Sequence, residues 1–318
     1  MARGRREAPI DNEREIEMSD QIFEGQVAIV TGSGAGMGKQ HALLLASRGA
    51  AVVVNDLAPT AQDVVDEIVA AGGKATLSKH DVSDPEQAKA LIQTAIDTFG
   101  GIHIVISNAA IIRSVRFIDM DYAAFDHIMK INAYGAFNVL NAAWPHLVAQ
   151  KYGRVVMVSS SSAWTSQPEI GHYAASKGAV LGLAKTLASE GAEFDITVNI
   201  LAPGAFTQMA GSQDDPAAKV MMETMMPASL VAPVVAWLVR KDNALNGQII
   251  EASAGRAALN FVGSTKGFWS KDLTIEDLIE HSEQVLDQEG FAVNGSTAEL
   301  AAWMTGDNTG WAAELAKA

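Results

Sequence analysis

Short apolar runs alternate with longer amphipathic stretches along most of this chain. Six runs are apolar at nearly every position and rich in β-branched residues: 27–31, 51–56, 103–107, 154–160, 196–203 and 248–253. Strands that are apolar on both faces are covered by helices on both sides, as in a parallel sheet. Helical patterns fill the gaps at 37–48, 60–71, 85–98, 122–150 and 173–193. The sequence therefore predicts an α/β fold, a doubly wound parallel sheet of the Rossmann type with helices on both faces.

The two ends of the chain differ from this alternating region. Residues 1–20 mix both charges and contain few large apolar side chains, which predicts a disordered tail. After Gly255 the sequence offers helical candidates at 274–289 and 296–318 and no further strand. We therefore expect a main domain over 21–255 and a mostly helical C-terminal extension over 256–318. The extension is expected to pack on the main domain or on a neighbouring subunit.

The composition narrows the possible functions. A formal net charge of −14 and a sequence pI of about 4.9 argue against a nucleic-acid partner, because phosphates require a basic surface. The chain has no cysteine, so it has no disulfides and no thiolate metal site, and we expect no bound metal. No segment reaches the roughly 18–20 apolar residues of a membrane span, and no apolar export segment begins the chain. We expect a cytoplasmic protein with a small-molecule substrate.

A glycine-rich loop follows the first predicted strand and runs directly into a helix. Gly32, Gly36 and Gly38 form the pattern Gly-x-x-x-Gly-x-Gly. Glycines there permit a tight turn and let a pyrophosphate approach the N–H groups of the helix N-terminus. Asp56 ends the second strand, where a carboxylate accepts hydrogen bonds from ribose hydroxyls and repels a 2′-phosphate. This arrangement favours NAD(H) over NADP(H), with a turn or cap role as the alternative for Asp56. Asp81, between the second and third apolar runs, has two interpretations of its own: a residue at the adenine edge or a helix cap.

Tyr173 and Lys177 lie four residues apart, which places them on one face of a predicted helix. A tyrosine phenol has an ordinary pKa of about 10, and a fixed neighbouring cation lowers that pKa toward the range useful for proton transfer. Many surface helices carry such a pair in solvent. The surrounding motifs therefore decide whether it is a catalytic pair.

Those motifs resemble the short-chain dehydrogenase/reductase family over roughly residues 26–255. They occur in the family's order: TGSGAGMG at 31–38, SNAA at 107–110, Asn132, Ser160, YAASK at 173–177, and Pro203-Gly204. The resemblance implies that NAD is the cofactor. The cofactor-binding residues that it implies are Gly32, Ser33, Gly36, Met37, Gly38, Asp56, Asp81, Val82, Asn108, Ala109, Tyr173, Lys177, Pro203, Gly204 and Thr207.

The same resemblance implies a catalytic role for four side chains. Tyr173 would exchange a proton with the substrate oxygen while a nicotinamide exchanges a hydride with the substrate carbon. Lys177 would lower the pKa of Tyr173 and hold the nicotinamide ribose. Ser160 would orient the substrate oxygen, and Asn132 would anchor a water that links Lys177 to solvent. Outside the family context, Ser160 and Asn132 would be a turn serine and a helix-packing asparagine.

The sequence departs from the family pattern at two places, one beside the expected cofactor and one near the expected substrate pocket. Ala110 stands where glycine is usual beside the cofactor, and Ala163-Trp164 replaces a common glycine with a large ring.

The expected substrate lid over 205–232 is rich in methionine, which suits either an irregular apolar ligand or ordinary core packing. These methionines are Met209, Met221, Met222, Met225 and Met226.

Three local segments narrow the substrate prediction. Residues 140–147, 225–239 and 247–256 resemble the (3R)-hydroxyacyl-CoA dehydrogenase units of multifunctional β-oxidation enzymes, which include 17β-hydroxysteroid dehydrogenases. The leading hypothesis is therefore an NAD(H)-dependent oxidoreductase for a 3-hydroxyacyl-CoA or a related bulky apolar alcohol. A hydroxysteroid or terpene-alcohol dehydrogenase and an NAD-binding regulatory or scaffold protein are the alternatives. Arg113, Arg116 and Arg256 are candidates for binding CoA, or else solvated surface charges.

The family resemblance also bears on assembly. It implies a homodimer or homotetramer whose interface uses the long helices over 122–150 and 173–193.

Overall fold

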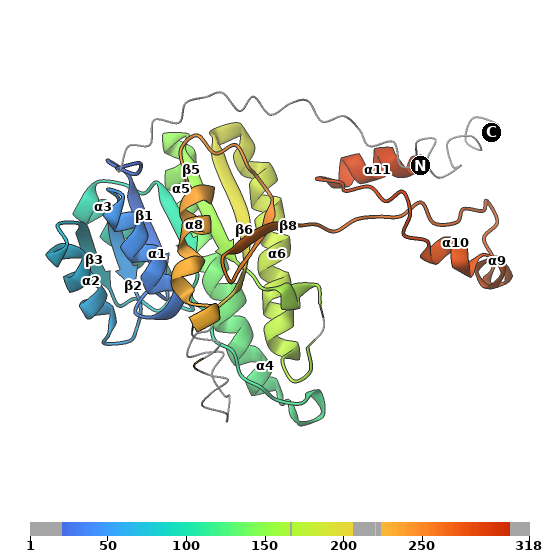
Figure 1. Ribbon diagram of the computed structural model, residues 1–318, viewed down its shortest axis with the longest axis horizontal. Coiled ribbons are helices and arrows are strands. Elements are labelled where there is room, and N and C mark those ends of the chain that lie inside the picture. The colour runs from blue at the N-terminus through green and yellow to red at the C-terminus, as the bar shows by residue number, and fades with distance from the viewer. Residues whose placement is uncertain (1–20, 166, 206–219, 221–223, 306–318) are drawn as a thin grey trace.

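The protein is built around one eight-stranded sheet with the strand order β3-β2-β1-β4-β5-β6-β7-β8 (Figure 1). This is a computed structural model, and it describes residues 21–165, 167–205, 220 and 224–305. Strands β1 to β7 pair in parallel, and β8 pairs antiparallel with β7. The predicted doubly wound α/β fold is confirmed. The expected tail over 1–20 lies outside the described residues.

The interior strands are buried on both faces, as their apolar runs predict. Every residue of β1, β2, β4 and β5 is buried. The edge strands β3 and β8 are partly exposed, which explains why neither stands among the six apolar runs. The strands are β1 (Val27–Thr31), β2 (Ala51–Asn55), β3 (Lys74–Ser78), β4 (Ile104–Ser107), β5 (Gly153–Val158), β6 (Ile196–Gly204), β7 (Ile249–Ser253) and β8 (Arg256–Asn260).

The prediction of no strand after Gly255 is wrong. Ala254 and Gly255 both have positive φ, 48° and 78°, and form a two-residue turn that returns the chain as β8. The sequence of β8 begins with Arg256 and is short of large apolar residues because the strand is exposed at the sheet edge. The boundary predicted at residue 255 therefore falls inside a β-hairpin.

Two layers of helices cover the sheet, and each layer has its own apolar core. One core lies beneath α3, α5 and α6, and the other beneath α1, α2 and α8. The predicted helix over 122–150 is interrupted by a five-residue π-helix, Lys130–Tyr134, between α4 and α5. The helices are α1 (Gly36–Ser47), α2 (Ala61–Ala70), α3 (Pro85–Phe99), α4 (Tyr122–Met129), α5 (Gly135–Gln150), α6 (Gly171–Gly191) and α8 (Ala232–Leu238).

The C-terminal extension leaves the sheet after β8 and carries three short helices away from the main body (Figure 1). They are α9 (Ile275–Glu280), α10 (Ser282–Leu286) and α11 (Thr297–Thr305), so this part of the chain is partly helical, as predicted. Ser264 and Ala292 exchange two backbone hydrogen bonds of 2.9 Å, which close the extension into a loop. No helix in the described part of the chain is long and apolar enough to cross a membrane.

Candidate active site

Two of the four expected catalytic residues, Tyr173 and Lys177, meet at the carboxyl ends of β4, β5 and β6. Parallel α/β sheets bind ligands at this edge. A cavity of about 130 Å³ opens there, and its lining includes Met37, Asn108, Tyr173, Lys177 and Pro203, all expected from the sequence. Among the described residues, no cluster of histidine or acidic side chains is arranged to hold a metal.

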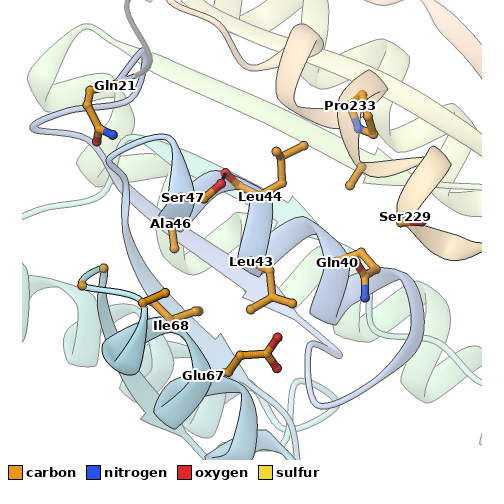
Figure 2. Close-up of a pocket in the computed structure, with 14 residues that line it drawn as sticks. Gln21, Gln40, Leu43, Leu44, Ala46, Ser47, Glu67, Ile68, Ser229 and Pro233 are labelled. Atoms are coloured by element: carbon orange, nitrogen blue, oxygen red, sulfur yellow. Dashed lines mark hydrogen bonds between the residues drawn. The ribbon is translucent and has the colours of Figure 1, made fainter.

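A larger cavity of about 540 Å³ lies elsewhere, and Figure 2 shows its lining. Leu43 and Leu44 of α1 lie between Ile68 of α2 and Pro233 of α8. None of the expected catalytic or cofactor residues lines it. Size alone therefore does not identify the site in this protein; the convergence of reactive groups does.

The glycine-rich loop turns too tightly for side chains. A Cβ on Gly38 would collide with the carbonyl oxygen of Gly32, and one on Gly32 would lie 2.8 Å from Cα of Ala109. Gly32 also has a φ of 64°. The N-cap residue of α1, Ala35, makes no side-chain hydrogen bond, so the first N–H groups of the helix are not capped by it. A bare backbone cradle at a helix N-terminus fits the pyrophosphate of a dinucleotide.

Asp56 lies across this loop and is held by two backbone N–H groups. Its Oδ2 accepts a hydrogen bond of 2.9 Å from Gly34, and its Oδ1 accepts one of 2.9 Å from Ala58. The turn interpretation of this residue is confirmed, and the ribose interpretation stays a prediction that the position of the carboxylate beside the glycine loop permits. Each carboxylate oxygen keeps a lone pair for a ribose hydroxyl.

Near the glycine loop, two side chains expected at the cofactor form hydrogen bonds with the protein backbone: Ser33 and Asp81. The Ser33 hydroxyl donates to the Val30 carbonyl at 2.7 Å. Asp81 accepts a hydrogen bond of 2.8 Å from the Ser83 N–H, so it stabilises a turn, and Asp84, not Asp81, is the N-cap of α3. The helix-cap alternative for Asp81 is therefore wrong. A cofactor contact for Ser33, Asp81 and Val82 stays a prediction.

Asn108 joins the end of β4 to the glycine loop. Its Nδ2 donates to the carbonyls of Thr31 and Gly32 at 2.9 and 3.0 Å. The hydroxyl of Thr31 accepts from the N–H groups of Asn108 and Ala109 at 2.9 and 3.0 Å. Thr31 is thus a central anchor that the sequence did not single out, although it begins the glycine motif. Ala110 lines the cavity, so the fold accommodates its methyl group beside the expected cofactor.

Tyr173 and Lys177 lie one turn apart on α6, as predicted, and both reach the cavity. The buried ammonium of Lys177 donates to the Val158 carbonyl at 2.8 Å, and its Nζ lies 5.7 Å from the centroid of the Tyr173 ring. Burial lowers the pKa of Lys177 to about 8. Burial raises the pKa of Tyr173, and a side-chain hydrogen bond with Ser160 opposes that rise. In this arrangement burial dominates the pKa of Tyr173 and the ammonium of Lys177 is turned to Val158, so the expected lowering of that pKa by Lys177 stays a prediction.

Ser160 stands between the catalytic tyrosine and a second serine. It is the N-cap of the short helical turn Ser161–Ala163, and its hydroxyl donates to Oγ of Ser162 at 3.1 Å. The Ser162 N–H donates back to the Ser160 Oγ at 3.2 Å. The turn role of Ser160 is confirmed, and its catalytic role stays a prediction. Trp164 packs against the core beneath α5 and α6 and is not part of the described lining of the cavity.

The side chain of Asn132 is fully hydrogen-bonded within the π-helix region. Its Oδ1 accepts from the N–H of Ile111 at 2.8 Å, and its Nδ2 donates to the Ile111 carbonyl at 2.9 Å and to the Ser176 hydroxyl at 3.1 Å. The Ser176 hydroxyl donates in turn to the carbonyl of Tyr173 at 2.7 Å. Asn132 therefore positions both the loop after β4 and the catalytic helix. Both Nδ2 hydrogens are used, so a water anchored by the Asn132 side chain would have to donate to the remaining lone pair of Oδ1.

Of the remaining expected residues, some can be placed in the structure and others lie outside the described residues. Gly204 ends β6 against Ser253, where a Cβ would lie 2.5 Å from the serine oxygen. Arg256 forms an ion pair of 3.0 Å with Glu251. Thr207, Met209, Met221 and Met222 lie outside the described residues.

Comparison with known proteins decides the family. The profile of the short chain dehydrogenase family matches residues 26–217. This chain belongs to the short-chain dehydrogenase family. A Mycobacterium tuberculosis protein described as a short-chain type dehydrogenase/reductase is 36% identical over 283 residues, 86% of this chain and 98% of that protein. As a short-chain dehydrogenase, the protein is an oxidoreductase.

Two further proteins are similar to this short-chain dehydrogenase. Peroxisomal multifunctional enzyme A of Dictyostelium discoideum is 37% identical over 273 residues, 83% of this chain and 60% of that enzyme. A solved 7α-hydroxysteroid dehydrogenase, in complex with NADH and 7-oxo glycochenodeoxycholic acid, is 31% identical with a TM-score of 0.68, over 74% of this chain and 96% of that one. The predicted similarity to units of multifunctional enzymes is confirmed.

Proposed function

We propose that this short-chain dehydrogenase interconverts a 3-hydroxyacyl-CoA and the corresponding 3-oxoacyl-CoA with NAD(H). The observation that carries the proposal is the Tyr173 phenol beside the Ser160 hydroxyl, with buried Lys177 one turn away, at the ligand-binding edge of the sheet. Two hydroxyl donors at one point suit a substrate oxygen that gains and loses a proton.

The residues present divide the work of alcohol oxidation. Tyr173 accepts the hydroxyl proton of the substrate, and in the reverse direction its phenol returns that proton to the carbonyl oxygen. Ser160 turns its hydroxyl from Ser162 to the substrate oxygen and stabilises the negative charge that develops there. NAD, when bound, accepts the hydride from the substrate carbon. The ammonium of Lys177, within reach of Tyr173, stabilises the phenolate once it leaves the Val158 carbonyl.

Asp56 supports NAD(H) rather than NADP(H) as the cofactor. Its carboxylate is fixed beside the glycine loop by Gly34 and Ala58, so it cannot swing away from a 2′-phosphate without losing two hydrogen bonds. Repulsion between that phosphate and the carboxylate disfavours NADP(H).

The substrate class rests on the similarity to the peroxisomal multifunctional enzyme and on the three local segments. The likeness to 7α-hydroxysteroid dehydrogenase favours a hydroxysteroid as the second candidate. A screen for NAD reduction by 3-hydroxyacyl-CoAs of several chain lengths, hydroxysteroids and cyclic terpene alcohols separates the two. If NAD binds but no alcohol in the panel is oxidised, the protein is instead an NAD-binding regulatory or scaffold protein.

We also propose that the protein acts as a homodimer or homotetramer. Exposed aromatic side chains follow one another from α4 through the π-helix to α5: Phe125, Tyr134 and Phe137. Ile275 and Ile279 are exposed on α9 of the extension. Apolar surface of this kind supports association of subunits. Light scattering of the full chain tests the proposal, and a monomer at micromolar concentration would contradict it.

A further inference from the structure

A loop between β4 and α4, residues 111–121, forms the rim of the active-site cavity. Ile112 lines the cavity together with Tyr173 and Lys177. The next residue, Arg113, is exposed, and so is Arg116. Four residues of extended chain span at most about 14 Å, so both arginines stand within that distance of Ile112 along the rim.

Hydrogen bonds fix the backbone of this rim at two points, and one side chain of the rim also lies close to α6. Asn132 holds both polar groups of the Ile111 backbone. The N–H of Val115 donates to the carbonyl of Glu169 at 2.8 Å, just before α6 begins. Met120 lies 3.8 Å from the position that a Cβ on Gly171 would occupy. The two arginines therefore extend from a positioned backbone.

The arginine heads have no acidic partner of their own. In the described part of the chain, neither Arg113 nor Arg116 forms an ion pair or a side-chain hydrogen bond. Other arginines do form ion pairs: Arg154 with Asp195, Arg240 with Asp242, and Arg256 with Glu251. In a protein with a net charge of −14, two unpaired guanidinium groups beside the catalytic cavity suit an anionic ligand.

The rim also presents apolar surface beside these charges. Phe117 and Ile118 are 84% and 88% exposed, directly after Arg116. A ligand with a long organic arm and phosphates at its far end would cover both features. Guanidinium groups bind phosphate through paired N–H donors.

We propose that Arg113 and Arg116 form the phosphate-binding subsite for CoA, where its pantetheine arm leaves the cavity across Phe117 and Ile118. The inference rests on the proposed function, since it assigns the recognition of the carrier half of the proposed substrate. The subsite binds the carrier and takes no part in hydride or proton transfer.

The test compares two thioesters of the same 3-hydroxyacyl group, one of CoA and one of N-acetylcysteamine, which lacks the phosphates. In the double variant Arg113→Gln/Arg116→Gln, we expect KM for the CoA thioester to rise about 10-fold or more while kcat stays unchanged. We expect KM for the N-acetylcysteamine thioester to stay the same in this variant. The matched control, Lys74→Gln/Lys151→Gln, removes two exposed charges at the opposite edge of the sheet and should change neither.

An equal change for both thioesters, or no change for either, overturns the subsite while leaving the proposed function intact. If the wild type oxidises neither thioester, the proposed function fails, and the subsite is then decided by calorimetry. Free CoA should bind the wild type at least about 10-fold more tightly than the double variant, and pantetheine should bind both equally. Equal binding of CoA to the two proteins overturns the subsite.

Discussion

His41 should make the stability of this protein depend steeply on mildly acidic pH. The side chain is buried in α1, the helix that begins in the cofactor loop, and neither ring nitrogen has a hydrogen-bond partner in the described part of the chain. Burial lowers its pKa from 6.5 to about 3. The folded protein therefore keeps a neutral imidazole at a pH where the unfolded chain binds a proton.

The direction and size of the effect follow from that difference. Below pH 6.5 the unfolded state binds more protons than the folded state, so the free energy of unfolding falls as the pH falls. At pH 5, about 1.5 pH units below the unfolded pKa, linkage gives a loss of about 2 kcal/mol relative to pH 7.5. The loss continues until the pH nears the folded pKa of about 3.

His41→Leu removes the proton-binding group and keeps a buried side chain of similar size. Urea unfolding, followed by circular dichroism at a fixed protein concentration from pH 7.5 to 5, should show a pH-dependent loss that is smaller by about 2 kcal/mol than in the wild type. His146→Gln, at an exposed position of α5, is the matched control and should keep the wild-type dependence. The reasoning is refuted if His41→Leu and the wild type lose the same free energy between pH 7.5 and 5.

Three substitutions test the site. Tyr173→Phe should lower turnover by at least ~10²-fold while leaving NAD binding unchanged in calorimetry, because it removes the proton-transfer group alone. Asp56→Ala should raise KM for NAD and lower KM for NADP; a wild type that prefers NADP would contradict the cofactor assignment. Asn132→Ala should destabilise the protein by about 1–3 kcal/mol, because it leaves part-buried polar groups of Ile111 unpaired. The same substitution should lower kcat. An unaltered kcat and melting temperature would exclude the positioning role of Asn132.

The interior of the fold could be predicted from the sequence because buried strands repeat apolar residues without interruption. The edge strand β8 could not, since its exposed position removes that pattern and its existence depends on the turn at Ala254 and Gly255. The π-helix at Lys130–Tyr134 was also hidden, because a single wide turn leaves the periodicity of the flanking helices unchanged.

In the candidate site too, sequence motifs identify residues, whereas properties that depend on the three-dimensional fold could not be predicted. Tyr173, Lys177 and Asn108 could be found because their spacing and order form known motifs. The raised pKa of Tyr173 could not, since it depends on burial beside the cavity, which no local spacing reports. The anchoring role of Thr31 depends on contacts with residues more than seventy positions away.

Hydrogen bonds tie the rim of the cavity to the catalytic helix on both sides. Asn132 joins Ile111, where the rim begins, to Ser176, which lies between the two catalytic residues of α6. Further along, Val115 of the rim is bonded to Glu169, just before the same helix. A carrier held by the rim is thereby held at a fixed distance from the Tyr173 phenol, because rim and helix move as one unit. If the rim binds the carrier and Tyr173 transfers the proton, Asn132 couples the two. A change there should then alter both KM and kcat, whereas changes at the rim arginines should alter KM alone.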